Sequence, residues 1–326
     1  MEAKYIFNYT SGGTYTNQIN SAGTKGIFNA PDINGFYTCG GFYSSGNYIP
    51  VKKYNYDLTV NTGFTLPVDI IGTTETMCVQ SDNKIVMSVY NIGIIRLNSD
   101  GTRDYSFSNY GYNGVVYSMV QDPTSGKILC GGQKMFRLNT DGTLDGTFQN
   151  YTVNPNPGGA PTPEKYIMVL NIQSTGKIIV NIPEYGTTPG PNTHTYSGLT
   201  VPNIFRLNSN GTVDLSWQVY TGIIGADTGY YRTANITVQP DDKVLIGGCF
   251  TNFDGYTTYY RLIRLNSDGT VDPNFMGPSF EPTHTPIPTA TPTQTPSPTA
   301  SSTPTPTPTP TSTPVPPTAT PTPTPI

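Results

Sequence analysis

The sequence IRLNSDGTVDPNF (residues 263–275) decides the fold, because the chain contains four similar copies of it. The other three are IRLNSDGTRDYSF (95–107), FRLNTDGTLDGTF (136–148) and FRLNSNGTVDLSW (205–217). Each places Asp-Gly or Asn-Gly between two strand-like halves, which predicts a β-hairpin with a type I′ turn. Self-similarity of this kind indicates one supersecondary unit that stacks on copies of itself.

A second, looser motif precedes each RLN motif. Its copies are CVQSDNKIVMS from Cys78, MVQDPTSGKILCGG from Met119, NIQSTGKIIVN from Asn171 and TVQPDDKVLIGGC from Thr237. Each has a polar turn before a short, β-branched apolar run, which favours two strands joined by a turn. Two hairpins in each unit predict a four-stranded sheet.

A degenerate first copy spans Asp32 to Phe64, with Lys53 where the other copies have arginine. The chain therefore contains about five units. The spacing between units is irregular, and most of the extra residues lie between the two hairpins of a unit, for example at 183–203 and 251–260. Insertions at one point of a repeat should lie on one rim of the array, where binding surfaces tend to be found.

This pattern resembles the delta-60 repeat, in which QPDGKIL-GG is followed by RLN-DG-D-F. The resemblance covers roughly Asp32 to Phe275. It implies an all-β, β-propeller-like array of about five four-stranded repeats, and it implies the setting of bacterial surface proteins or phage virion proteins rather than a catalytic site. An early strand at Lys4 to Thr10 either completes the last sheet or serves as a docking arm.

The composition changes sharply after the last motif. More than half of the 31 prolines lie after Gly277, alternating with threonine. Proline fixes φ and removes the amide donor, so Thr-Pro repeats favour extended polyproline II over helix or sheet. We therefore expect a repeat domain at residues 1–276 and an extended Pro/Thr-rich stalk or linker at 277–326.

Composition argues against several classes of protein. Charged residues make up 12% of the chain and the net charge is −4, so there is no basic surface to neutralise nucleic-acid phosphates. No apolar run is long enough to span a membrane, and the start MEAKYIFNYTSGG lacks the features of a signal peptide. We expect synthesis in the cytoplasm, no membrane insertion and no nucleic-acid partner. The four cysteines lie in strand-like runs without metal-ligand spacing, which favours buried thiols.

The repeated arginine and aspartate of the RLN motif are expected to form structural pairs across the hairpin, each contributing a fraction of a kcal/mol. The pairs are Arg96 with Asp104, Arg137 with Asp145, Arg206 with Asp214, and Arg264 with Asp272. The oxygen-rich turn also resembles part of a calcium loop, but it lacks the terminal glutamate, so no metal is expected.

No catalytic motif and no cofactor site are found. The two histidines, His194 in a long loop and His284 in the tail, belong to no recognisable triad or metal motif, and no carboxylate pair stands out. Tyrosines in turns and insertions are the candidate partner-binding residues, since tyrosine offers a large contact area at low entropy cost. They are Tyr230, Tyr231, Tyr256, Tyr259 and Tyr260, and packing between sheets is the alternative role for each.

These features favour a non-enzymatic structural or binding module displayed on a stalk. Its expected setting is a phage virion, as a fibre or decoration protein that contacts other virion proteins or glycans. A bacterial cell-surface adhesin is the first alternative. A carbohydrate-active propeller enzyme is the second.

Overall fold

The structure is a computed structural model, and contacts divide the chain into two compact units, Met1–His284 and Thr285–Ile326. The structure describes residues 5–9, 15–20, 24–31, 34–44, 46–112, 114–152, 166–167, 169–182, 193–220, 222–224, 234–248, 250, 252–257 and 262–275. The predicted Pro/Thr stalk, from residue 277 onward, lies outside these residues.

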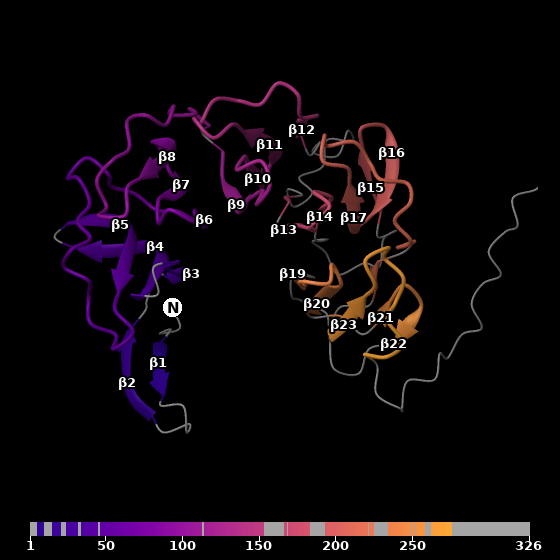
Figure 1. Ribbon diagram of the computed structural model, residues 1–326, viewed down its shortest axis with the longest axis horizontal. Coiled ribbons are helices and arrows are strands. Elements are labelled where there is room, and N and C mark those ends of the chain that lie inside the picture. The colour runs from indigo at the N-terminus through magenta and orange to yellow at the C-terminus, as the bar shows by residue number, and fades with distance from the viewer. Residues whose placement is uncertain are drawn as a thin grey trace, which may run out of the picture. The chain divides into compact units, whose positions relative to one another are not determined.

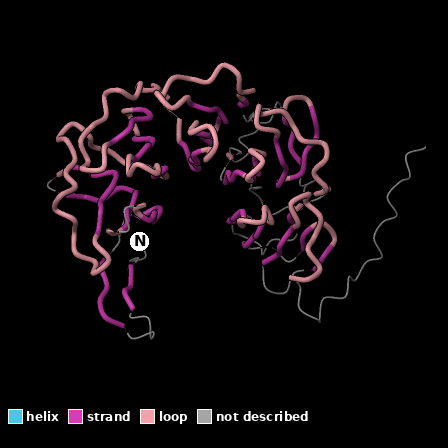
Figure 2. The backbone as a smooth tube through the Cα atoms, in the orientation of Figure 1, coloured by secondary structure: helices cyan, strands magenta, loops and turns pink. Residues whose placement is uncertain are grey.

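The described part of the chain is all-β and contains no helix (Figure 2). Five antiparallel sheets follow one another along the sequence, and we number them repeats 1 to 5 (Figure 1). Repeat 1 has β3 (Thr24–Asn29), β4 (Phe36–Ser44) and β5 (Asn47–Tyr54); repeat 2 has β6 (Met77–Val79), β7 (Ile85–Val89) and β8 (Gly93–Leu97); repeat 3 has β9 (Val116–Gln121), β10 (Ile128–Gly132), β11 (Lys134–Leu138) and β12 (Tyr151–Thr152); repeat 4 has β13 (Val169–Ile172), β14 (Ile178–Asn181) and β17 (Ile204–Leu207); repeat 5 has β19 (Ala234–Val238), β20 (Val244–Gly248) and β23 (Leu262–Leu265).

The fourth strand is reduced to a single bridge in repeats 1, 4 and 5 of the described chain, and it is split into short pieces in repeats 2 and 3. In every repeat, one residue after the RLN turn bridges the end of the third strand, as Leu97 pairs with Arg103 in repeat 2. The chain then leaves the sheet in a turn and returns, so that Ile94 pairs with Tyr110 and, in repeat 3, β11 pairs with β12. The all-β, propeller-like prediction is confirmed, but among the described residues only repeat 3 has a fourth strand in its sheet, and the other four repeats have three.

The RLN turn differs from the expected type I′ turn. In repeat 2, Gly101 N–H donates to Asn98 O at 3.0 Å and Asn98 N–H donates to Thr102 O at 2.8 Å. Gly101 has a φ of +90°, while Asp100 is not among the residues with positive φ. This is a three-residue loop, a type I turn followed by a left-handed glycine. The type I′ prediction was wrong, because a type I′ turn has positive φ at both Asp100 and Gly101, whereas here only Gly101 has positive φ.

Sheets that follow one another along the sequence bury the faces that they turn toward each other. We call the face that packs on the following repeat the forward face and the opposite one the backward face. Forward residues Val86, Ile94 and Phe107 of repeat 2 form one cluster with backward residues Ile128 and Phe136 of repeat 3. Similar clusters join repeats 1 and 2, 3 and 4, and 4 and 5. Successive copies therefore share apolar interiors, as expected for a stacked repeat.

Two elements lie where the sequence did not place them. Repeat 1 begins with β3 at Thr24, before the expected start at Asp32. This first strand was not predicted, because no QPDGK-like motif follows it in the sequence. The early strand β1 (Tyr5–Tyr9) pairs with β2 (Tyr15–Asn20) in a separate sheet, so it does not complete the sheet of repeat 5.

The insertions form small hairpins. β15 (Thr193–Tyr196) pairs with β16 (Leu199–Pro202) inside repeat 4. In repeat 5, β21 (Asn252–Phe253) pairs with both β18 (Ile223–Ile224) and β22 (Tyr256–Thr257). Nothing in the described residues has the length and helical form needed to cross a membrane as a helix.

Candidate functional site

The aspartate at the end of each RLN motif is the centre of a charged cluster. In repeat 3, Asp145 Oδ2 accepts from Arg137 Nε at 2.7 Å and from Lys127 Nζ at 2.9 Å. Its Oδ1 accepts from the backbone N–H and the hydroxyl of Thr147, at 3.0 and 2.6 Å. Asp145 is 2% exposed, so both carboxylate oxygens are buried and satisfied.

Equivalent clusters occur in repeats 2, 4 and 5. The structure brings together all four predicted Arg–Asp pairs, with Nε to Oδ2 distances of 2.8 Å for Arg96 and Asp104, 2.7 Å for Arg206 and Asp214, and 2.9 Å for Arg264 and Asp272. The lysine partner comes from the second motif in every case and was not foreseen. These lysines are Lys84, Lys127, Lys177 and Lys243.

Hydrogen bonding lowers the pKa of these carboxyls. For Asp104, burial alone would raise the pKa, but hydrogen bonds from Ser106, Lys84 and Arg96 outweigh it and hold the pKa well below its usual range. Asp145 and Asp214 have the same opposing causes and the same direction of shift. These carboxylates are therefore ionised at neutral pH and engaged in structure.

The arginine also joins its repeat to the next one. Nη1 of Arg137 donates to the carbonyl of Ser209 in the RLN turn of repeat 4, at 2.5 Å. Arg96 and Arg206 donate to the equivalent carbonyls of the following repeats, at 2.9 and 2.5 Å. The guanidinium of Arg137 also lies over the ring of Phe148, with its central carbon 4.8 Å from the ring centroid. One side chain thus connects the aspartate, the motif aromatic ring and the neighbouring turn.

The turn glycine allows this close approach. Gln218 N–H, which follows the motif aromatic Trp217, donates to Asp268 O of repeat 5 at 3.0 Å. A Cβ at the adjacent Gly269 would lie 2.8 Å from the Trp217 ring and 2.9 Å from Gln218 N. Glycine is therefore needed both for its φ of +96° and for the contact between repeats. The charged and glycine positions of the motif act together as a junction between repeats.

The insertions leave the sheets at the end opposite to these turns. Consecutive strands of a repeat are antiparallel, so the first-to-second and third-to-fourth turns share one end, which we call the motif end. The second-to-third connections, and the connections to the following repeat, share the other end, which we call the insertion end. The hairpins β15–β16 and β21–β22 lie within second-to-third connections and therefore belong to the insertion end.

An aromatic patch lies at the insertion end of repeats 1 and 2. It consists of Tyr43, Tyr48, Ile71 and Tyr90, which are 70%, 51%, 46% and 60% exposed. The rings of Tyr43 and Tyr48 meet edge to face with centroids 5.3 Å apart. Gly72 N–H donates to Tyr48 O at 2.8 Å, and Tyr90 N–H donates to Thr73 O at 2.9 Å, which brings the three segments together. We call this set the rim patch.

The predicted partner-binding tyrosines are placed only in part. Tyr256 lies in β22 and is half-buried, while Tyr230, Tyr231, Tyr259 and Tyr260 lie outside the described residues. Sequence reasoning missed Tyr43 and Tyr48, although the sequence YSSGNY has a turn flanked by two tyrosines. That spacing is a usable signal, because residues flanking a hairpin tip face each other across the turn.

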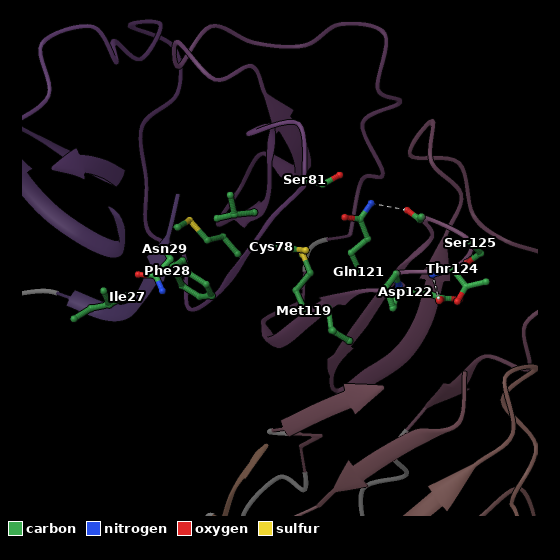
Figure 3. Close-up of a pocket in the computed structure, with 15 residues that line it drawn as sticks. Ile27, Phe28, Asn29, Cys78, Ser81, Met119, Gln121, Asp122, Thr124 and Ser125 are labelled. Atoms are coloured by element: carbon green, nitrogen blue, oxygen red, sulfur yellow. Dashed lines mark hydrogen bonds between the residues drawn. The ribbon is translucent and has the colours of Figure 1, made fainter. Parts of the chain in front are cut away.

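A groove of about 880 Å³ lies beside the first strands of repeats 1, 2 and 3 (Figure 3). Ile27 and Phe28 come from β3, Cys78 from β6, and Met119 and Gln121 from β9. The turn that follows β9 adds polar groups at one end. The groove therefore combines an apolar floor with a polar rim, a composition common in binding sites.

The reactive groups of the groove have structural roles. Burial raises the pKa of the Cys78 thiol to about 11, so the thiol is protonated at neutral pH. Asp122 accepts from Thr124 N–H at 2.9 Å and from the Ser125 hydroxyl at 2.6 Å, which stabilises the turn. Among the described residues, no cluster of His, Cys, Asp and Glu is arranged to hold a metal ion.

The structure also places one histidine and three of the cysteines considered in the sequence. His194 lies in β15, not in a loop, and is buried with Nε2 3.1 Å from the carbonyl of Ile182. Cys39, Cys78 and Cys130 are buried free thiols, and Cys249 lies outside the described residues.

Three segments of the chain, residues 80–107, 192–216 and 239–275, match the model of a family described as a domain of unknown function (DUF5122) beta-propeller. These segments contain the RLN motifs of repeats 2, 4 and 5. The match supports a propeller-like repeat family, and the narrower resemblance to the delta-60 repeat stays a prediction. No curated protein matches the chain.

Two solved structures show distant similarity. The WD40 beta propeller domain of Doa1 is 18% identical with a TM-score of 0.35, and the match covers 52% of this chain and 51% of that one. The extracellular domain of BT4673 from B. thetaiotaomicron is 14% identical with a TM-score of 0.40, and the match covers 72% of this chain and 28% of that one. The chain thus spans about half and about a quarter of these two proteins.

Proposed function

We propose that this protein is a non-enzymatic binding module, carried on a Pro/Thr-rich stalk and displayed on a phage virion as a fibre or decoration protein. Its binding surface is the insertion end of the sheets, and its partner is a glycan or another protein. The observation that carries the proposal is the separation of roles between the two ends. The motif end carries the ion pairs and arginine hydrogen bonds that recur at the junctions between repeats, and the insertion end carries the rim patch and the variable hairpins.

The hydrogen bonding of the motif aspartates supports a non-enzymatic role. Asp104, Asp145 and Asp214 each accept hydrogen bonds from a lysine, an arginine and a neighbouring hydroxyl. Their depressed pKa makes them poor general acids at neutral pH. The rim patch offers the opposite chemistry, namely large aromatic faces with low charge, which suits stacking on sugar rings or on apolar side chains of a partner.

Binding by the rim patch is tested with the full-length chain on a glycan array and against purified coat proteins of the particle. We expect the Tyr43→Ala/Tyr90→Ala variant to lose at least tenfold in affinity for any hit. Tyr105→Ala is the matched control, because Tyr105 is 81% exposed but lies in the turn after the RLN motif. Equal losses in both variants would remove the rim patch from the proposal.

Two further measurements test the other parts of the proposal. Incubation of the chain with each bound glycan, followed by mass spectrometry, should return the glycan intact, and cleavage would instead indicate a carbohydrate-active enzyme. Proteomics of purified phage particles should detect the chain. Its absence from particles, together with its presence on bacterial cells, would favour the surface adhesin.

A further inference from the structure

The forward faces of repeats 2, 3 and 4 have a common composition. Each presents an apolar residue from the second strand, another from the start of the third strand, and the motif aromatic ring. In repeat 4 these are Ile179, Ile204 and Trp217, which are 0%, 0% and 7% exposed beneath repeat 5. Each forward face also directs the terminal nitrogen of its arginine to a carbonyl of the next repeat.

Repeat 5 presents the same forward face, and no repeat in the described part of the chain packs on it. Leu245 and Phe275 are half-buried and Leu262 is 43% exposed, whereas their counterparts in repeats 2 to 4 are buried. The Arg264 side chain is 22% exposed, compared with 7% to 12% for the arginines of repeats 2 to 4. Among the described residues, no carbonyl accepts from the Nη1 atom of Arg264.

The junctions between repeats 2 and 3, 3 and 4, and 4 and 5 show which kind of surface packs on a forward face. The occupant must present two turn carbonyls, one for the arginine and one for the backbone N–H after the aromatic ring. It must also have glycine next in the turn, because a Cβ at Gly142 would lie 2.4 Å from Ser108 O, and one at Gly101 would lie 2.7 Å from Thr65 O. The complement is therefore a sheet with an Asn-Xaa-Asx-Gly-Thr turn.

Repeat 1 of this chain does not meet these requirements. Leu58, with a φ of 68°, occupies the position that is glycine in repeats 2 to 5, and its side chain packs on Phe36 and Tyr54. Thr38 and Lys52 form the cross-strand pair that is Met87 and Ile95 in repeat 2. The backward face of repeat 1 thus has a polar pair in place of an apolar one, and its turn is closed by an apolar cluster of its own side chains, as is typical of a terminal repeat that caps a stack.

We propose that the forward face of repeat 5 is a docking surface for a β-sheet repeat of a different protein chain, one that carries an Asn-Xaa-Asx-Gly-Thr turn. The proposal extends an interface that this chain already makes three times to one more repeat. Neither repeat 1 of the same molecule nor repeat 1 of a second copy is the occupant, because the Leu58 side chain fills the place of the incoming backbone.

A redesigned copy of the full chain serves as the first probe. Thr38→Met, Lys52→Ile and Leu58→Gly give its repeat 1 the backward face of repeat 2, and Leu262→Asp disables its own forward face. Sedimentation velocity should show a 1:1 complex between this probe and the wild-type chain. The control probe carries Thr38→Met, Lys52→Ile and Leu262→Asp but retains the wild-type Leu58. It should bind the wild-type chain at least tenfold more weakly than the first probe does. The Arg264→Ala chain should also bind the first probe about tenfold more weakly.

Three outcomes of this experiment would overturn the proposal. The first is that a folded probe, judged by circular dichroism and by an unchanged urea midpoint, forms no complex. The second is that both probes bind equally well. The third is that the wild-type chain self-associates in a way that Leu262→Asp abolishes, which would make a second copy the occupant.

The source of the occupant is tested in the native assembly. A photo-crosslinking residue is placed at Leu262, and the crosslinked peptides are sequenced. We expect a peptide from another protein that contains an Asn-Xaa-Asx-Gly-Thr turn. Crosslinks to residues 55–59 of this chain, or the absence of any crosslink, would refute the proposal.

Discussion

Replacing Gly269 with alanine should weaken the junction between repeats 4 and 5. Its φ of +96° makes any side chain costly, by about 1 kcal/mol. The added Cβ would also lie 2.8 Å from the Trp217 ring and 2.9 Å from Gln218 N, so the Trp217–Gln218 segment must move. That movement lengthens the 3.0 Å bond from Gln218 N–H to Asp268 O, at about 1 kcal/mol. Overpacking against the ring adds about 1 to 2 kcal/mol.

The expected total is a loss of about 3 to 4 kcal/mol in the free energy of unfolding. Gly255→Ala is a matched control from the same repeat, since Gly255 has a φ of +89° but no atom within 4 Å of an added Cβ. That variant should lose only about 1 kcal/mol. The chain has one tryptophan, Trp217, which lies in this junction, so urea unfolding followed by its fluorescence reports on the contact directly.

Equal urea midpoints for the two variants would refute the reasoning. The turn glycine would then be needed only for its backbone conformation, and the packing of repeats would not depend on it. A red-shifted emission of folded Gly269→Ala, relative to Gly255→Ala, would independently show that the Trp217 ring has been displaced from its buried position.

Three further predictions concern the charged cluster and the stalk. Asp145→Ala leaves the cations of Arg137 and Lys127 without their carboxylate, and should cost about 3 to 5 kcal/mol in urea denaturation, whereas the exposed Asp57→Ala variant should leave the urea midpoint nearly unchanged. The motif aspartates have a lower pKa in the folded chain than in the unfolded chain, so the unfolded chain binds protons first as the pH falls. The melting temperature should therefore stay constant from pH 7 to about 5 and fall as the pH drops below about 4. A constant melting temperature down to pH 2 would contradict this. Deleting everything after Gly277 should leave the melting temperature within about 2 °C of the full chain, because the Pro/Thr segment has almost no apolar side chains to bury.

Much of the fold follows from local sequence. The repeated motifs locate the strands and the number of repeats, because β-branched runs and turn residues act over a few positions. The pairing of Arg96 with Asp104 is equally local, since residues on either side of a short hairpin turn must lie close together. The turn type does not follow from the dipeptide, because Asp-Gly is compatible with hairpin loops of two and of three residues, which differ in the number of residues with positive φ.

The contacts between repeats could be seen only in the tertiary structure. Lys84 reaches Asp104 from another hairpin, and Arg96 reaches Thr140 in another repeat. The sequence carries a glycine in each RLN turn, but it does not reveal that Trp217 and Gln218 press against one of them. The rim patch is another case, because its segments come together only when repeats 1 and 2 pack.

The sequence by itself thus determined a chain of similar small sheets, of which repeats 2 to 5 have an internal ion pair. The tertiary structure decided which faces of the sheets pack on each other, which end carries the polar contacts between repeats, and that within the described part of the chain no repeat packs on the forward face of repeat 5. The physical reason is the range of the forces involved. Propensity and turn geometry act within a hairpin, whereas apolar burial and the satisfaction of buried polar groups depend on which surfaces meet.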